Sequence, residues 1–144
     1  MSNALVPEFA VSDWQRSLTF YARLGFETAY TRPEEGFAFL RLGEAELMID
    51  EIGLGRTFDE GHAPTDYPFG RGVNLQIRVP CVAPLVAALS AKGIALFLPL
   101  EDRWYRVGEE EAGNRQFVVA DPDGYLLRFV EELGRRPAAP RGGP

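Results

Sequence analysis

Residues 11–26 read VSDWQRSLTFYARLGF, and residues 79–94 repeat their pattern as VPCVAPLVAALSAKGI. The leading valine, the apolar helix positions and the closing glycine return at an offset of 68 residues. Each copy has the pattern of a strand, a turn, a helix that ends at glycine, and a second strand. The repeat predicts that the chain of 144 residues consists of two similar halves.

Turn signals and alternating apolar residues extend each copy into a β-α-β-β-β module. We expect the first module at residues 1–51, a connecting loop at 52–72, the second module at 73–134 and a disordered tail at 135–144. The tail is rich in Pro, Gly and Arg and poor in apolar residues. The expected fold class is therefore α+β, with the two modules forming curled mixed sheets around a cleft and helices covering the outer faces.

Each module has one expected helix. Ser12 and Gln15 form a capping box at the start of the first helix, and Gly25 ends it. The second helix is expected from about Val82 to Lys92. The expected strands are residues 5–11, 26–30, 37–42 and 45–51 in the first module, and 73–79, 94–98, 103–107, 115–120 and 125–130 in the second. Residues 121–124 form a tight turn before the last strand.

The composition is that of a globular protein, and it limits the classes of partner. Apolar residues make up 46% of the chain, and no apolar run approaches the ~20 residues that cross a bilayer. The net charge of −6 disfavours nucleic-acid binding and weakly favours a cationic or neutral ligand. The single cysteine, Cys81, and the absence of an export signal favour a cytoplasmic protein. We therefore expect a small-molecule ligand, with neither a nucleic-acid nor a membrane partner.

Polar residues at alternate positions of three expected strands mark a candidate site. Glu8 lies on the first strand, Asn74 and Gln76 on the fifth, and Arg128 on the last. Alternate residues of a strand share one face, and buried polar groups need partners, so we expect these side chains to converge. Two interpretations stay open: a structural polar network in which Glu8 pairs with Arg128, and contacts to a ligand in the cleft.

Three separated motifs carry a resemblance to a known family. They are residues 11–26, the stretch Gly72-Val73-Asn74-Leu75-Gln76, and the stretch Asp121-Pro122-Asp123-Gly124-Tyr125. With the duplication, they make the chain resemble the vicinal oxygen chelate superfamily, also called the glyoxalase/bleomycin-resistance/dioxygenase superfamily. Residues 104–106 and 115–129 are similar to its bleomycin-resistance branch.

The resemblance implies four metal-ligand positions, which the enzymes of the superfamily fill with His, Glu or Gln. Here they fall on Val6, Asn74 and Arg128, with the fourth near Glu46 or Met48. Valine cannot ligate, asparagine is a poor ligand for a divalent ion, and arginine adds positive charge. We therefore expect no metal or other cofactor, no catalytic residue, and a binding protein rather than an enzyme. The alternatives are a metal-dependent lyase, isomerase or dioxygenase with an atypical site displaced to Glu8 and Gln76, and a scaffold whose cleft has lost its ligands.

The bleomycin-resistance branch also implies a homodimer that confers antibiotic resistance by sequestering its ligand unchanged, in clefts lined by aromatic and acidic side chains. Planar ligands stack on aromatic rings, and carboxylates attract cationic groups, so we expect a planar or cationic ligand. The candidate ligand-binding residues are Glu8, Phe39, Met48, Asp50, Phe58, Tyr67, Asn74, Gln76, Trp104, Tyr105, Phe117 and Arg128. Further negative charge is expected from Glu46, Asp102 and the run Glu109-Glu110-Glu111.

Overall fold

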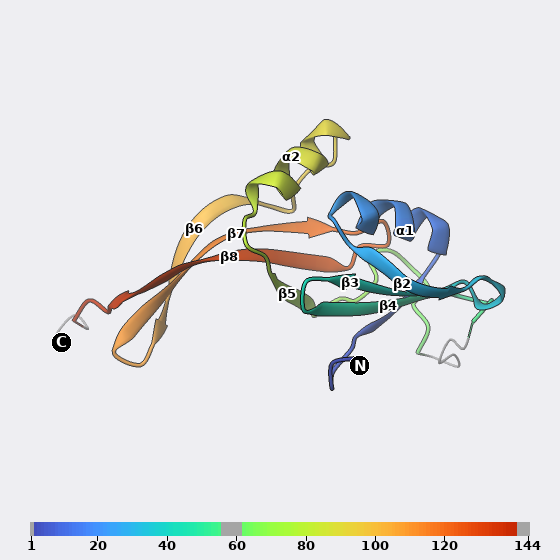
Figure 1. Ribbon diagram of the computed structural model, residues 1–144, viewed down its shortest axis with the longest axis horizontal. Coiled ribbons are helices and arrows are strands. Elements are labelled where there is room, and N and C mark those ends of the chain that lie inside the picture. The colour runs from blue at the N-terminus through green and yellow to red at the C-terminus, as the bar shows by residue number, and fades with distance from the viewer. Residues whose placement is uncertain (1, 56–61, 141–144) are drawn as a thin grey trace.

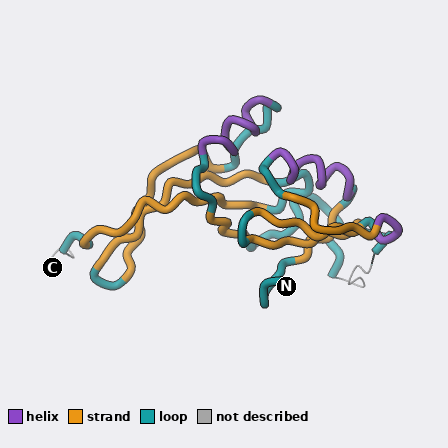
Figure 2. Tube along the Cα trace, viewed as in Figure 1, coloured by secondary structure: helices purple, strands orange, loops and turns teal. Residues whose placement is uncertain are grey.

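A computed structural model describes residues 2–55 and 62–140 of the chain (Figure 1). In this part, the chain forms two four-stranded mixed sheets and two α-helices, an α+β fold (Figure 2). Phe58, one of the candidate ligand contacts, lies outside the described residues. No helix within the described ranges is long and apolar enough to cross a membrane.

The first module builds one sheet and the helix above it. Its elements are β1 (Glu8–Val11), α1 (Trp14–Arg23), β2 (Glu27–Arg32), the short 3₁₀ helix η1 (Pro33–Glu35), β3 (Phe37–Leu42) and β4 (Ala45–Glu51). The strands are ordered β1-β4-β3-β2, with β1 parallel to β4 and the other neighbours antiparallel. The expected bounds of β3 and β4 are confirmed.

The second module repeats this arrangement. Its elements are β5 (Asn74–Arg78), α2 (Ala83–Ala91), β6 (Leu98–Val107), β7 (Glu110–Ala120) and β8 (Leu126–Pro137). The order β5-β8-β7-β6, with β5 parallel to β8, matches the first sheet strand for strand. The duplication that the repeated stretch predicts is therefore confirmed.

The duplication is also present in the hydrogen bonds at the start of each helix. Glu51, at the end of β4, accepts the amide hydrogen of Trp14 at an N–O distance of 3.1 Å. Glu131, on β8, accepts the amide hydrogen of Val82 at 3.0 Å. Trp14 and Val82 are separated by the repeat offset of 68 residues. The two glutamates thus occupy equivalent positions in the two modules.

Helix α1 begins with a different cap from the one that the sequence pattern predicts. Asp13, and not Ser12, caps it: the Asp13 carboxylate accepts the amide hydrogens of Gln15 and Arg16 at 3.1 and 3.2 Å. The Ser12 hydroxyl instead donates to a carboxylate oxygen of Asp123 at 2.6 Å. Ser12 therefore ties the first module to the turn between β7 and β8, a long-range contact that local sequence cannot reveal.

The predicted tight turn between β7 and β8 holds Asp121 at the boundary of the modules. Its Oδ2 accepts the hydroxyl hydrogen of Tyr21 on α1 at 2.7 Å. Its Oδ1 accepts the amide hydrogens of Asp123 and Tyr125, each at 2.9 Å, which closes the turn. Burial raises the pKa of Asp121 to about 6, although these hydrogen bonds lower it in part.

Tyr125 makes a second connection between the modules. Its hydroxyl donates to the carbonyl oxygen of Ala10 at 2.8 Å. Its ring stacks on Phe9, with centroids 4.0 Å apart, and meets the ring of Phe69 edge-on. The turn motif at residues 121–125 is thus accounted for by the packing of the two modules on each other.

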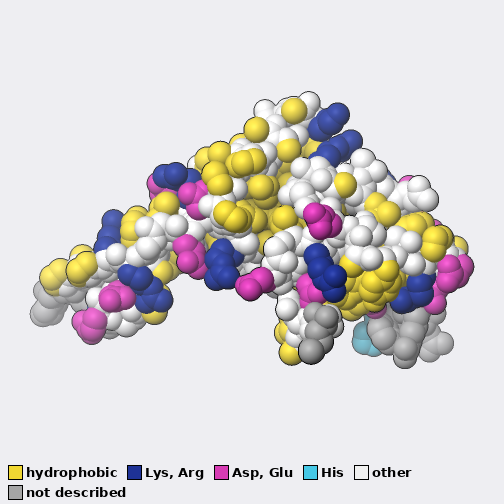
Figure 3. All heavy atoms as spheres, in the orientation of Figure 1, with side chains coloured by type: hydrophobic (Ala, Val, Ile, Leu, Met, Phe, Trp, Pro, Cys, Tyr) yellow, Lys and Arg dark blue, Asp and Glu magenta, His cyan; other side chains and the backbone are white. Residues whose placement is uncertain are grey.

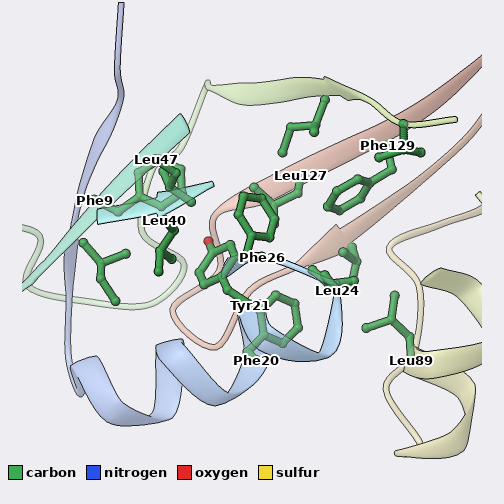
Figure 4. Close-up of a cluster of buried hydrophobic side chains, with 14 of the residues drawn as sticks. Phe9, Phe20, Tyr21, Leu24, Phe26, Leu40, Leu47, Leu89, Leu127 and Phe129 are labelled. Atoms are coloured by element: carbon green, nitrogen blue, oxygen red, sulfur yellow. The ribbon is translucent and has the colours of Figure 1, made fainter. Parts of the chain in front are cut away.

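One hydrophobic core spans both modules (Figure 4). Helix α1 contributes Phe20, Tyr21 and Leu24, and the second module contributes Leu127 and Phe129 from β8. Each of these side chains is almost fully buried, and burial of apolar surface on this scale is the main stabilising contribution to a small domain. Because α1 contacts β3 and β4 of its own module and α2 of the second, the two sheets are held on one core, and their faces that point away from the helices are positioned by it.

Strands β6, β7 and β8 extend beyond the core as an arm (Figure 1, Figure 2). The strands expected at 94–98 and 103–107 are replaced by the single strand β6, whose register shifts between Leu98 and Glu101. The shift is a bulge, in which extra residues interrupt the ladder without ending the strand. Residues 94–97 precede β6 and are not part of a strand.

The last residues of β8 correct the expected tail. Arg135 and Arg136 belong to the strand, with ion pairs to Glu110 at 3.3 Å and to Glu111 at 2.8 Å. Glu110 and Glu111, two of the carboxylates expected to supply negative charge, therefore belong to β7 and pair across its ladder. Polar composition alone predicted a disordered tail, whereas opposite charges across the ladder support a strand.

Candidate functional site

The sheet face of the second module that points away from the core carries the polar candidates. We call it the open face of the second sheet. Its residues include Asn74, Gln76 and Arg78 of β5, Leu126 and Arg128 of β8, Gln116, Val118 and Ala120 of β7, and Tyr105 of β6. The alternate residues Ile77, Phe117 and Phe129 lie in the core, as strand alternation requires. Four candidates, Asn74, Gln76, Tyr105 and Arg128, thus share this face, with Gln76 beside Arg128 in register.

Gln116 is the centre of a hydrogen-bonded group that we call the Arg128 cluster. Its Oε1 accepts from Nη1 of Arg128 at 3.2 Å. Its amide nitrogen is 2.6 Å from the Tyr105 hydroxyl oxygen and 3.2 Å from Oε1 of Glu101. Gln116 is only 1% exposed, so these partners satisfy a buried amide and hold it in one orientation. Arg128 is thus part of a polar network, but its observed partner is Gln116, which the sequence did not single out, and not the predicted Glu8.

An apolar pocket lies at one end of the same face. It has a volume of about 290 Å³, and Tyr67, Phe69, Val73, Phe97 and Leu126 are among its lining residues. Tyr67 is 62% exposed and Phe97 68% exposed, although both are aromatic. Exposed aromatic side chains around an apolar hollow are typical of a binding site. Tyr67 is one of the candidate ligand contacts, whereas Phe97 precedes the bulge of β6 and lies outside any periodic pattern that could mark it.

The outward face of the first sheet brings four other candidates together. Glu8, Met48 and Phe39 are neighbours in one row of the ladder, and Asp50 follows in the next row beside Phe37. Burial, and then the nearby Glu35 carboxylate, raise the pKa of Asp50. This face therefore combines a partly desolvated acid with aromatic rings.

Arginines already cover the aromatic rings of this first-sheet face. The guanidinium of Arg32 lies 3.8 Å from the Phe37 ring centroid, and that of Arg41 lies 5.2 Å from the Phe39 centroid. Phe39 also stacks on Tyr30, with centroids 5.4 Å apart. A cationic ligand would have to compete with these internal cation–π contacts.

Two aromatic candidates lie elsewhere. Phe117 is fully buried and stacks on Phe129 in the core at 5.4 Å, so its ring is enclosed by protein. Trp104 lies in the arm, where its ring is 4.0 Å from the guanidinium of Arg136 and packs closely over the backbone of Gly113. Phe117 follows Gln116 and Trp104 precedes Tyr105 in sequence. Because successive side chains of a strand point to opposite faces, Phe117 and Trp104 lie on the other side of the sheet from the Arg128 cluster.

Most of the carboxylates expected to attract a cationic ligand have arginine partners. Asp102 accepts two hydrogen bonds from Arg115, at 2.8 and 3.1 Å, which hold the pKa of Asp102 below its ordinary value. Glu46 pairs with Arg41 at 2.8 Å, and this pairing lowers the pKa of Glu46. The carboxylates at these positions are thus already paired with arginines of the same chain.

The equivalence of Glu51 and Glu131 identifies the residue of β4 that corresponds to Arg128 of β8. Arg128 lies three residues before Glu131, and Met48 lies three residues before Glu51. The four ligand positions that the resemblance implies would then be Val6, Met48, Asn74 and Arg128. This set offers no carboxylate, imidazole or thiolate, and it places a cation among the ligands, so it does not fit a divalent metal. Among residues 2–55 and 62–140, no three His, Cys, Asp or Glu side chains form a group that could hold a metal ion.

Solved structures with the same arrangement include proteins of different activity. TioX from Micromonospora sp. ML1 is 25% identical, with a TM-score of 0.67, over 92% of this chain and 100% of that one. A bleomycin-binding protein complexed with bleomycin is 22% identical, with a TM-score of 0.59, over 90% and 98% of the two chains. Lactoylglutathione lyase from Agrobacterium tumefaciens is 15% identical, with a TM-score of 0.60, over 91% and 94%. The last two likenesses concern the fold alone.

The family follows from the sequence match rather than from these folds. No curated protein matches the chain. A family model, described as Glyoxalase/Bleomycin resistance protein/Dioxygenase superfamily, matches residues 5–129. Because the match spans both modules, the chain belongs to the Glyoxalase/Bleomycin resistance protein/Dioxygenase superfamily.

Proposed function

We propose that this protein binds and sequesters a small organic molecule of antibiotic type, with a planar ring system, and does not transform it. The observation that carries the proposal is the open face of the second sheet, where the Arg128 cluster lies beside an apolar pocket of about 290 Å³. A mostly apolar hollow with a few fixed polar groups is the usual composition of a small-molecule site.

The residue chemistry favours binding over catalysis. The positions that would hold a metal in an enzyme of this superfamily are Val6, Met48, Asn74 and Arg128, and they do not fit one. The only histidine, His62, is exposed in the connecting loop. Among the proteins of similar fold, one binds bleomycin and another is a lactoylglutathione lyase, so the fold is compatible with either role and the residues of this site carry the proposal.

We also propose that the protein acts as a homodimer in the cytoplasm. Apolar side chains gather on the surface around α2 and the adjoining part of the second sheet (Figure 3). Leu100 and Val107 on β6 are 44% and 46% exposed. A second copy that covers such a surface with an interface well above ~1,000 Å² would remove it from water. Light scattering at micromolar concentration tests this part, and a species of only 16.0 kDa contradicts it.

A thermal-shift screen tests the binding function. The panel contains bleomycin-class drugs, other planar organic compounds of positive, neutral and negative charge, and divalent metal salts. A ligand that binds only the native state raises the unfolding temperature in proportion to its occupancy. We expect at least one planar compound to stabilise the protein and the metal salts to leave it unchanged.

A variant that fills the pocket links the screen to the site. Ala120 lines the pocket, so Ala120→Phe should abolish the shift given by the hit, whereas Ala22→Phe on the exposed side of α1 should retain it. Elemental analysis accompanies the screen. A stoichiometric metal, or no stabilisation by any organic compound, contradicts the proposed function.

A further inference from the structure

Arg128 is the charged group in the middle of the open face of the second sheet. Its side chain is partly buried, and Nη1 donates to Oε1 of Gln116 at 3.2 Å. Within the two described ranges of the chain, no carboxylate forms an ion pair with it. Arg115 on the neighbouring strand is different, because Asp102 binds it through two hydrogen bonds. Arg128 therefore has a neutral partner where Arg115 has an anionic one.

The Gln116 amide cannot neutralise Arg128. A guanidinium presents five N–H donors and remains charged at any pH at which a protein is folded. Removing such a charge from water costs free energy unless an anion or several acceptors replace the water. The amide nitrogen of Gln116 is engaged with Tyr105 and Glu101. Gln116 therefore separates Glu101 from Arg128 while it holds the guanidinium in place, and donors of Arg128 remain for another group.

The apolar pocket lies next to these donors on the same face. Leu126 lines the pocket, and Arg128 is two residues further along β8. Successive residues on one face of a strand are ~7 Å apart, the length of a short spacer or of one ring. Phe97 and Val73 border the pocket from the other sides and are 68% and 57% exposed. A single molecule can thus place an apolar body against these side chains and a polar end at Arg128.

We infer that the ligand of this site is an amphipathic anion, whose carboxylate, sulfonate or phosphate oxygens bind Arg128 and whose aromatic or aliphatic body fills the apolar pocket. The inference rests on the proposed function and specifies the ligand class. It reverses the cationic preference that the net charge of −6 suggests, because Arg71 at the pocket and Arg78 on the same face are paired with carboxylates, whereas Arg128 has a neutral partner.

Three naphthalene derivatives of nearly equal size test the inference: the carboxylate, the carboxamide and the methylammonium. Each is titrated into the full chain and its dissociation constant is measured by calorimetry. We expect the carboxylate to bind about 10- to 100-fold more tightly than the carboxamide, the range given by a hydrogen bond to a charged group. The methylammonium should bind most weakly. Equal affinities for carboxylate and carboxamide, or no binding of the carboxylate, overturn the inference.

Two variants test whether Arg128 is the residue that gives the carboxylate its higher affinity. Arg128→Gln should remove the advantage of the carboxylate over the carboxamide and leave the carboxamide affinity within about twofold. The matched control is Arg78→Gln, which removes an arginine from the same face that is already paired with Glu44 and Glu132. It should keep the preference. If Arg128→Gln retains the preference, or instead changes only the oligomeric state in sedimentation, Arg128 has another partner and the inference is wrong.

The thermal-shift panel separates failure of the inference from failure of the proposed function. If neutral or cationic planar compounds stabilise the protein and anionic ones do not, the binding function stands and the anionic ligand class is wrong. If no organic compound of any charge stabilises the protein, the binding function itself fails. Unfolding curves of Arg128→Gln without ligand show whether the variant is folded, and Arg128→Lys supplies a second variant that keeps the charge and should retain part of the preference.

Discussion

Tyr21 on α1 and Asp121 at the start of the β7–β8 turn are joined by a hydrogen bond of 2.7 Å between the hydroxyl and Oδ2. The two residues are 100 positions apart in sequence and belong to different modules. Both are almost fully buried, and burial raises the pKa of each above its ordinary value. This bond therefore ties the orientation of one module to that of the other at a position that is shielded from solvent.

Tyr21→Phe should destabilise the whole protein and not one module alone. The substitution removes the hydroxyl donor and leaves Asp121 without its partner on α1. We expect the free energy of unfolding to fall by about 1–3 kcal/mol, the cost of an unsatisfied buried acceptor. Urea denaturation followed by circular dichroism measures it. Tyr67→Phe is the control, since Tyr67 is 62% exposed, and a change equal to that of the control would show that the bond contributes nothing.

Asp121 should also give the stability an unusual dependence on pH. Its pKa is about 6 in the folded protein against an ordinary value of 3.8. The native state therefore binds more protons than the unfolded state between these values, and stability falls as the pH rises through this window. The contribution is fully present below pH ~4 and is lost above pH ~6, a difference of about 3 kcal/mol.

Urea denaturation of the wild type and of Asp121→Asn from pH 4 to pH 7 isolates this contribution. The stability difference between them should move in favour of the wild type as the pH falls, because the variant lacks the titrating group. Asp102→Asn is the control, since Arg115 holds the pKa of Asp102 below its ordinary value of 3.8, so the contribution of Asp102 is nearly constant from pH 4 to pH 7 and is lost only below this window. A constant difference between wild type and Asp121→Asn would exclude Asp121 as the titrating group.

The architecture was accessible from the sequence because its signals are local and occur twice. Alternation and turn residues predicted β3 and β4 with their observed bounds, and the repeat predicted a second module of the same topology. The arm could not be predicted in the same way. Its strands continue through Glu110, Glu111, Arg135 and Arg136, whose polarity resembles that of a loop until cross-strand partners are known.

The site was predictable only where strands alternate between polar and apolar residues. Asn74, Gln76 and Arg128 alternate with core residues, so their common face could be expected. In β7 the run Phe117-Val118-Val119 is apolar on both faces and gives no signal of which side is the core. Phe117 was therefore expected at the ligand, whereas the adjacent Gln116 occupies that face.

Gly113→Ala should disrupt the arm without unfolding the core. A Cβ atom at position 113 would lie 2.7 Å from the ring of Trp104, which is closer than such contacts occur. The ring is covered on another side by Arg136 at 4.0 Å, so it cannot move without losing that contact. We expect a loss of about 1–3 kcal/mol from overpacking and faster amide exchange in β6 and β7. Adding Trp104→Phe should rescue part of the loss, whereas no rescue would place the strain elsewhere.

Glu131→Ala should destabilise α2 more than Glu51→Ala destabilises α1, although the glutamates are equivalent. Helix α2 has no side-chain cap of its own, so Glu131 is the carboxylate at its first turn, whereas α1 is capped by Asp13 in addition to Glu51. Loss of a capping acceptor costs about 0.5–2 kcal/mol, and we expect Glu131→Ala near the upper end and Glu51→Ala near the lower. Urea denaturation gives the total loss of unfolding free energy for each variant, and amide exchange in each helix shows where protection is lost.

Glu132→Ala is the control, because its ion pair with Arg78 at 3.4 Å is exposed and should contribute under about 0.5 kcal/mol. Equal losses for the two glutamates would mean that the Asp13 cap does not share the stabilisation of α1.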